Sequence, residues 1–145
     1  VDHRLRGKQA FTLVELLIVI IILATLAAIV GPKFTNTSTT SKEAALRANL
    51  KVLREAIDRF ALDTDLYPKS LDDLAAVKAP TDGVDRFSAT DRSLNASDWQ
   101  GPYVDSVPPD PITGKPFNYV ARSGRYSLSS SATGRALDGT LYSNW

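Results

Sequence analysis

An unbroken apolar run dominates the start of the chain. Residues 11–30 are apolar except for two threonines and Glu15. A helix of about twenty apolar residues is long enough to cross the hydrocarbon core of a bilayer. We therefore predict a transmembrane helix over residues 11–34, preceded by a short leader at residues 1–10. A carboxylate inside such a segment is expensive, so Glu15 needs a partner.

The pattern then becomes amphipathic, and residues 35–65 are predicted to form the second half of the same helix. Apolar side chains recur at spacings of four, three, four and three: Leu46, Leu50, Leu53, Ile57 and Phe60. These spacings place the apolar side chains in one stripe, which we expect to pack on the domain's own sheet. A partner-binding coiled coil is the alternative, and it is disfavoured because the heptad is not sustained.

Gly31-Pro32 lies between the two halves. Proline removes a helical hydrogen bond and clashes with the preceding turn, so a kink or local melting is expected there. Thr40 and Glu43 have capping-box spacing and mark where a broken helix would restart. For the chain on its own we predict a single long helix with its weak point at residues 35–41.

Residues 66–145 are predicted to form a globular α/β head, which makes the fold class α+β. Pro68 is expected to stop the long helix, and Ser70 to cap a short helical turn. Residues 79–97 are polar and rich in turn formers, so they are predicted to be an irregular loop. Aromatic content predicts short strands at Phe117 to Tyr119 and over residues 124–128, in a small antiparallel sheet.

Charge and cysteine content restrict the partners and the compartment. The 145 residues carry a formal net charge of +1, which gives no reason to expect nucleic acid. The leader is basic, with Arg4, Arg6 and Lys8 against Asp2, which predicts a cytoplasmic N-terminus and an exported head. The chain has no cysteine, so an exported head must be stabilised by packing, by assembly or by an ion.

Two ordinary explanations of the N-terminal segment are a secretory signal peptide and a plain single-pass anchor. A signal peptide has an apolar core of about 7–15 residues followed by a small-residue cleavage site. The run here is longer, residues 24–28 offer a poor site, and neither explanation accounts for Glu15. Both are therefore disfavoured.

The segment Ala10-Phe11-Thr12-Leu13-Val14-Glu15 resembles the processing motif of type IV pilins and pseudopilins. The resemblance implies that a prepilin peptidase cuts between Ala10 and Phe11 and methylates the new amine of Phe11. The family usually has glycine before the cut, so Ala10 is a departure. The resemblance also implies a filament whose core contains the helix over residues 11–34.

The resemblance also assigns partners within that filament. It implies that Glu15 pairs with the Phe11 amine of an adjacent subunit, and it places Thr12, Gly31 and Pro32 among the assembly residues. The alternative for Glu15 is that its carboxylate lies near enough to the interface to reach headgroup water.

A second set of short motifs resembles the major pseudopilin of type II secretion systems: Tyr67-Pro68, Gly101-Pro102-Tyr103, Asp110-Pro111 and Asn144-Trp145. Ile112 is a departure, because the family typically has tryptophan there. The family's last loop usually carries several acidic residues that bind calcium, but residues 126–145 contain only Asp138. We therefore expect no cofactor, with Asp138 the single acidic candidate for a calcium ligand, and a C-terminal loop closed by Tyr142 and Trp145.

No catalytic constellation is evident. The single histidine, His3, lies in the leader, and no nucleophile has a base beside it in the pattern. We therefore expect a structural protein and not an enzyme.

The resemblance implies a homopolymer drawn from the bacterial inner membrane into a periplasmic filament. The implied partners are the prepilin peptidase, an assembly platform with its ATPase, minor pseudopilins and, before assembly, membrane lipid. One alternative is a surface type IV pilin for adhesion, motility or electron transfer, disfavoured by the lack of a cysteine pair. The other is a DNA-uptake pilin using Arg122, Arg125 and Arg135. That is disfavoured because the chain without its leader has fourteen basic and fifteen acidic residues.

Overall fold

The computed structural model describes residues 11–122 and 124–145, and the side chains of residues 29–37 lie outside this description. The leader, including Ala10, therefore also lies outside the described residues. The chain divides into two compact units, Val1–Ser38 and Thr39–Trp145. We call the second unit the head.

One helix, α1, runs from Leu13 to Thr64 and confirms the prediction of a single long helix. Its backbone stays helical through Gly31 and Pro32, so the restart considered at Thr40 is not needed. The helix ends at Thr64, before Pro68. The next residue, Asp65, has a left-handed φ of 57° and donates its N–H to the Ala61 carbonyl over 3.1 Å. A left-handed residue of this kind satisfies an orphan carbonyl and terminates a helix.

The predicted apolar stripe forms the centre of the head's core. Leu46, Leu50, Leu53, Ile57 and Phe60 are each no more than 1 % exposed. The side chains buried against them come from the rest of the head, and they include Leu66, Tyr67, Leu74, Phe117, Leu128 and Tyr142. The stripe therefore packs on its own domain, as predicted.

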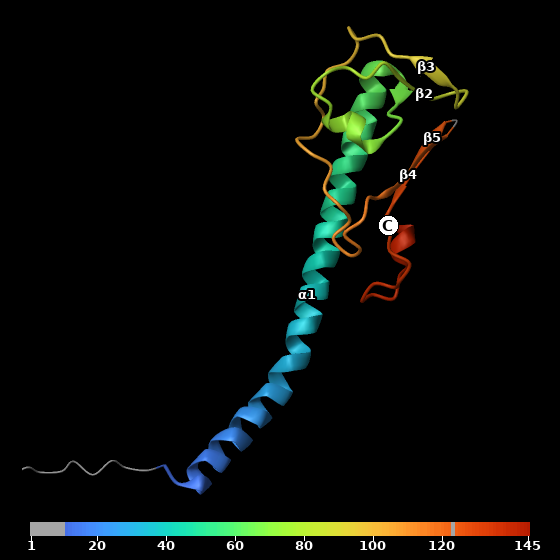
Figure 1. Cartoon of the computed structure of the whole chain (residues 1–145). Coiled ribbons are helices and arrows are strands. Elements are labelled where there is room, and N and C mark those ends of the chain that lie inside the picture. Colours follow the sequence, from blue (N-terminus) through green and yellow to red (C-terminus); the bar gives the residue numbers. More distant parts are fainter. Residues whose placement is uncertain (1–10, 123) are drawn as a thin grey trace, which may run out of the picture. The chain divides into compact units, whose positions relative to one another are not determined.

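Two antiparallel sheets complete this α+β head (Figure 1). The first has the order β1-β2-β3, formed by Leu66–Tyr67, Asp82–Asp85 and Asp91–Ser93. The second pairs β4, Asn118–Arg122, with β5, Arg125–Ser129, with Tyr119 opposite Leu128. Two 3₁₀ helices, η1 at Leu71–Ala75 and η2 at Tyr142–Asn144, complete the elements.

The prediction of an irregular loop over residues 79–97 is wrong, because β2 and β3 lie within it. Asp82-Gly83 resembled a turn, but Gly83 is a strand residue packed closely on β1. A Cβ at Gly83 would lie 2.9 Å from the Leu66 Cβ, so glycine is what lets β2 approach β1 this closely. The Asp85 carboxylate accepts the N–H groups of Phe87 and Ser88, which supports the turn between the two strands.

The Gly101-Pro102-Tyr103 motif fastens a long loop to the C-terminal end of α1. The Tyr103 hydroxyl donates to Asp63 over 2.8 Å, and its ring packs on Phe60 at a centroid distance of 5.5 Å. Trp99 meets Tyr103 edge-on at 6.3 Å. A Cβ at Gly101 would lie 2.5 Å from the Trp99 ring, so the indole occupies the space beside this glycine.

Gly101→Ala is therefore expected to destabilise the head by about 1–3 kcal/mol, because the added methyl overpacks against Trp99. Urea denaturation followed by circular dichroism measures this change. Gly134→Ala is the matched control, since a Cβ there would make an ordinary 3.7 Å contact with Tyr142. Equal stability of the two variants would show that the Trp99 contact does not constrain this loop.

Candidate functional site

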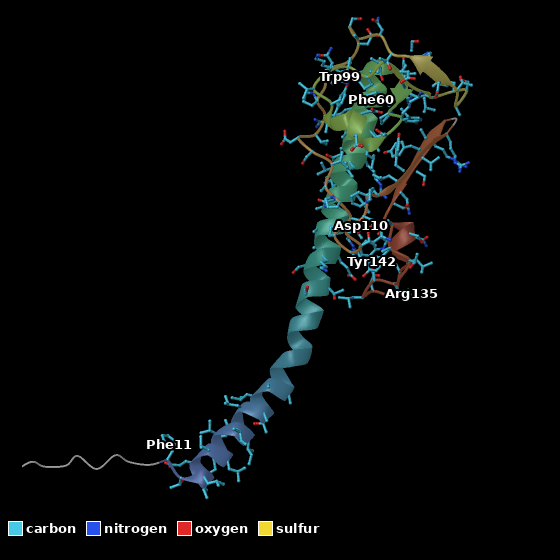
Figure 2. All side chains as sticks on the ribbon, in the orientation of Figure 1. Phe11, Phe60, Trp99, Asp110, Arg135 and Tyr142 are labelled. Carbon is cyan, nitrogen blue, oxygen red and sulfur yellow. The ribbon has the colours of Figure 1, made fainter. Side chains whose placement is uncertain are left out.

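The N-terminal part of α1 exposes apolar side chains on every face. Residues 11–28 are all exposed, and the large apolar side chains among them run consecutively from Leu16 to Leu23. Phe11, at the start of this segment in Figure 2, is 73 % exposed. A helix that is apolar all round is covered by lipid or by other helices in a stable environment.

The predicted membrane span can be compared with the helices that the structure describes. Within the part of the chain that it describes, no helix combines the length and the apolarity that crossing a membrane requires. The predicted span of residues 11–34 includes residues 29–34, whose side chains lie outside that part, and Gly31 and Pro32 are among them.

Thr12 and Glu15 form a capping box at the first turn of α1. The Glu15 carboxylate accepts hydrogen bonds from the Thr12 N–H and from the Thr12 hydroxyl, both at 3.1 Å. The Thr12 hydroxyl oxygen in turn accepts the Glu15 N–H at 3.2 Å. Each side chain satisfies an orphan backbone donor of the other, which stabilises the helix start.

Sequence reasoning missed this capping box, although its signal is visible. The Thr-x-x-Glu spacing at Thr12 is the same spacing that was noted at Thr40. The structure thus joins Thr12 and Glu15, two of the predicted assembly residues, directly after Phe11 in the chain. It also gives Glu15 hydrogen-bond partners within its own chain.

At the other end of the described chain, the C-terminal loop, residues 130–145, is fastened to α1 by charged side chains. Glu43 is buried, and one of its oxygens accepts both the Leu137 N–H at 2.9 Å and the Tyr142 hydroxyl at 2.8 Å. Burial, followed by this contact with Glu43, raises the pKa of Tyr142 to about 12. The tyrosine hydroxyl therefore stays protonated and remains a donor at neutral pH.

Two arginines on α1 extend this attachment. Arg47 donates to the Asp138 carboxylate over 2.7 Å, and its guanidinium lies 4.0 Å from the centroid of the Trp145 ring. Arg54 donates to the main-chain carbonyl of Leu128 at 3.1 Å and to that of Trp145. The predicted packing of Tyr142 and Trp145 is confirmed, but the charged partners on α1 were not foreseen.

Asp110 anchors the loop between β3 and β4, residues 94–117, which we call the proline-rich loop, to the end of β5. It is fully buried, and its carboxylate accepts the Ser130 hydroxyl at 2.5 Å, the Ser131 N–H at 2.9 Å and the Ile112 N–H at 2.8 Å. Burial alone would raise the pKa of Asp110, but these hydrogen bonds together lower it. Figure 2 shows Asp110, Arg135 and Tyr142 at one end of the head, and Phe60 and Trp99 at the other.

The Asp138 carboxylate and the Gly139 carbonyl, two groups of the C-terminal loop with oxygens suited to calcium, already accept hydrogen bonds from the chain. Calcium takes six to eight oxygen ligands, several of them carboxylates in strong sites. One Asp138 oxygen accepts from Arg47, and the other accepts the Thr140 N–H and hydroxyl at 2.9 and 2.6 Å. The Gly139 carbonyl accepts from Arg135 at 2.7 Å. Among the residues described, no three His, Cys, Asp or Glu side chains are grouped to hold a metal ion.

Comparison with known proteins gives consistent matches. A family model described as type II secretion system, protein G, matches residues 33–141, and a prokaryotic N-terminal methylation motif matches residues 5–31. The type II secretion system core protein G of Pseudomonas aeruginosa is 30 % identical over 80 % of this chain and 75 % of its own length. The proteins of the same description from Aeromonas hydrophila and Klebsiella pneumoniae are 29 % and 31 % identical. They cover 80 % and 74 % of this chain and 75 % and 71 % of their own lengths. No solved structure matches the chain.

Asp110→Asn is expected to destabilise the head by about 2–4 kcal/mol, because an amide NH₂ would replace an acceptor facing buried donors. Urea denaturation at neutral pH measures this loss. Asp105→Asn, on an exposed residue of the same loop, is the matched control and should change stability little. An unchanged free energy of unfolding in Asp110→Asn would show that the buried carboxylate does not hold the loop.

Acid is expected to destabilise the head below about pH 4, near the ordinary pKa of aspartate. Hydrogen bonds from the Thr140 side chain and backbone, and then Arg47, lower the pKa of Asp138, and the pKa of Asp110 is lowered as well. A lowered carboxyl pKa adds stability above its unfolded value, which is lost as the pH falls through the folded value. Urea midpoints measured from neutral pH downward should therefore fall more steeply for the native chain than for Asp110→Asn. Parallel profiles would contradict this assignment.

Proposed function

This chain belongs to the type II secretion system protein G family, and we propose that it is the structural subunit of the filament used by that system. The family model covers residues 33–141, which is most of the chain and all of the head except its last four residues. The matching relatives are all core protein G of type II secretion, which favours this branch over a surface pilin or a DNA-uptake pilin. The function proposed is therefore assembly, with no chemical step.

The observation that carries the proposal is the uncovered apolar surface of residues 11–28. Burying apolar surface stabilises by roughly 25 cal/mol per Å², so a helix exposed on every face gains strongly from lipid or from packing with its copies. Subunits related by a head-to-tail operation that does not close into a ring form helical filaments. Lipid would cover the helix before assembly, and neighbouring helices would cover it afterwards.

The methylation motif supports a processing step that precedes assembly. It matches residues 5–31, which cover the second half of the leader and the first part of α1. Cleavage between Ala10 and Phe11 by a prepilin peptidase would free an amine immediately before the Thr12–Glu15 capping box. The basic leader would stay on the cytoplasmic side, with the head outside the inner membrane. An assembly platform, its ATPase and minor pseudopilins would act on the processed subunit.

Two roles are proposed for Glu15, one in the single chain and one in the filament. In the single chain its carboxylate caps α1 through Thr12. In the filament it would pair with the positively charged Phe11 amine of an adjacent subunit, because a buried carboxylate is tolerated when it is paired and hydrogen-bonded. A neutral amide at this position can still accept the Thr12 N–H, but it cannot balance a charge.

Glu15→Gln is therefore expected to reduce filament assembly about as strongly as Glu15→Ala, by roughly tenfold or more, because losing a buried charge pair costs several kcal/mol. Assembly is measured as the fraction of sheared, sedimentable filament at equal subunit levels. Glu55→Gln, on an exposed part of α1, is the matched control and should assemble normally.

The two substitutions separate capping from pairing. Normal assembly by Glu15→Gln, with loss only in Glu15→Ala, would show that Glu15 acts as a helix cap alone. Normal assembly by both variants would contradict any assembly role. Methylation of Phe11, read by mass spectrometry, reports whether each variant was processed before its assembly was scored.

A further inference from the structure

The C-terminal loop contains little regular structure of its own. Its only pairing among the described residues is an isolated bridge between Arg135 and Leu141, followed by the short helix η2. A sixteen-residue segment of this kind loses considerable conformational entropy when it is ordered. Its position must therefore be held by contacts with the rest of the head.

Asp110 holds the start of the loop at Ser130 and Ser131, and the contacts with the rest of the loop come from one face of α1. Glu43, Arg47 and Arg54 are separated by four and seven residues, so they lie along the same side of the helix. Glu43 binds the loop at Leu137 and Tyr142, and Arg54 binds the Trp145 carbonyl. Arg47 lies between them and meets both Asp138 and Trp145.

Arg47 thus supplies a positive charge at the loop's one acidic residue. Its guanidinium donates to one Asp138 oxygen while Thr140 donates twice to the other. The same guanidinium lies over the Trp145 ring, and the Trp145 N–H donates to the Thr140 hydroxyl at 2.7 Å. Asp138, Thr140 and Trp145 are therefore joined into one unit around a single cation.

We propose that the Arg47 guanidinium is the cation that closes the C-terminal loop, in place of the calcium ion that the family resemblance implies. The hydrogen bonds of the loop support this, because both oxygens of its one side-chain carboxylate, that of Asp138, already accept hydrogen bonds from Arg47 and Thr140. Arg135 adds a second guanidinium on the Gly139 carbonyl. The loop then folds without metal, and its closure depends on the charge and the planar shape of Arg47. This inference concerns the head alone and stands whether or not the chain assembles.

Hydrogen exchange of the loop tests the proposal on the full-length chain in detergent micelles. Exchange of peptides covering residues 130–145 is followed by mass spectrometry with excess chelator and with excess calcium chloride. The expected result is the same exchange rate in both conditions. Slower exchange with calcium would overturn the proposal, because it would show a bound ion ordering the loop.

The second arm removes the guanidinium. Arg47→Ala should speed exchange of the loop about fivefold, since it loses both the ion pair and the cation–π contact. Arg47→Lys should give an intermediate rate, because it keeps the charge without the planar group. Lys51→Ala is the matched control: Lys51 is exposed one turn further along α1 and its pair with Glu55 is 3.9 Å long.

Asp138→Asn approaches the same contact from the loop and leaves α1 intact. It should speed exchange in the same direction as Arg47→Ala, with exchange in β4 and β5 unchanged. Unchanged loop exchange in both Arg47→Ala and Asp138→Asn would overturn the proposal. Equal acceleration in Lys51→Ala would also overturn it, because the effect would then belong to α1 in general.

Discussion

The burial of apolar surface along one long helix is the interaction on which this protein depends. The first part of α1 exposes apolar side chains throughout residues 11–28, whereas the second part buries its stripe from Leu46 to Phe60 within the head. Because apolar burial is the main driving force of both folding and association, the two parts have different consequences. The second part completes a fold, and the first part requires something outside the chain.

A few polar contacts of high specificity hold the loops of the head in place. Buried Asp110 joins the proline-rich loop to the end of β5, and buried Glu43 joins the C-terminal loop to α1. Buried carboxylates are tolerated because several donors converge on each. With no cysteine in the sequence and no group of metal ligands among the described residues, these contacts and the core position the loops. Arg47 acts in the same way, because its side chain supplies a positive charge to the C-terminal loop from within the chain.

Much of this architecture could be predicted from the sequence, and the failures have physical reasons. The long helix and the burial of Ile57 and its neighbours follow from local periodicity, which depends only on residues a few positions apart. Strand β2 was missed because a glycine at position 83 resembles a turn signal in the sequence. Glycine is needed there because β1 packs against it too closely for a side chain, which only the tertiary structure shows. The Arg47–Asp138 pair joins residues that are distant in the sequence, and no local pattern reveals it. The Thr12–Glu15 capping box was visible, because both of its members lie within one helical turn.

In the proposed filament, the apolar surface of residues 11–28 ends in contact with other copies of this chain. An electron cryomicroscopy reconstruction of filaments sheared from cells tests it most directly. We expect this segment of every subunit to lie in the filament interior, in contact with neighbouring helices, with the heads outside. A filament in which residues 11–28 face solvent, or remain covered by lipid or detergent, would contradict it.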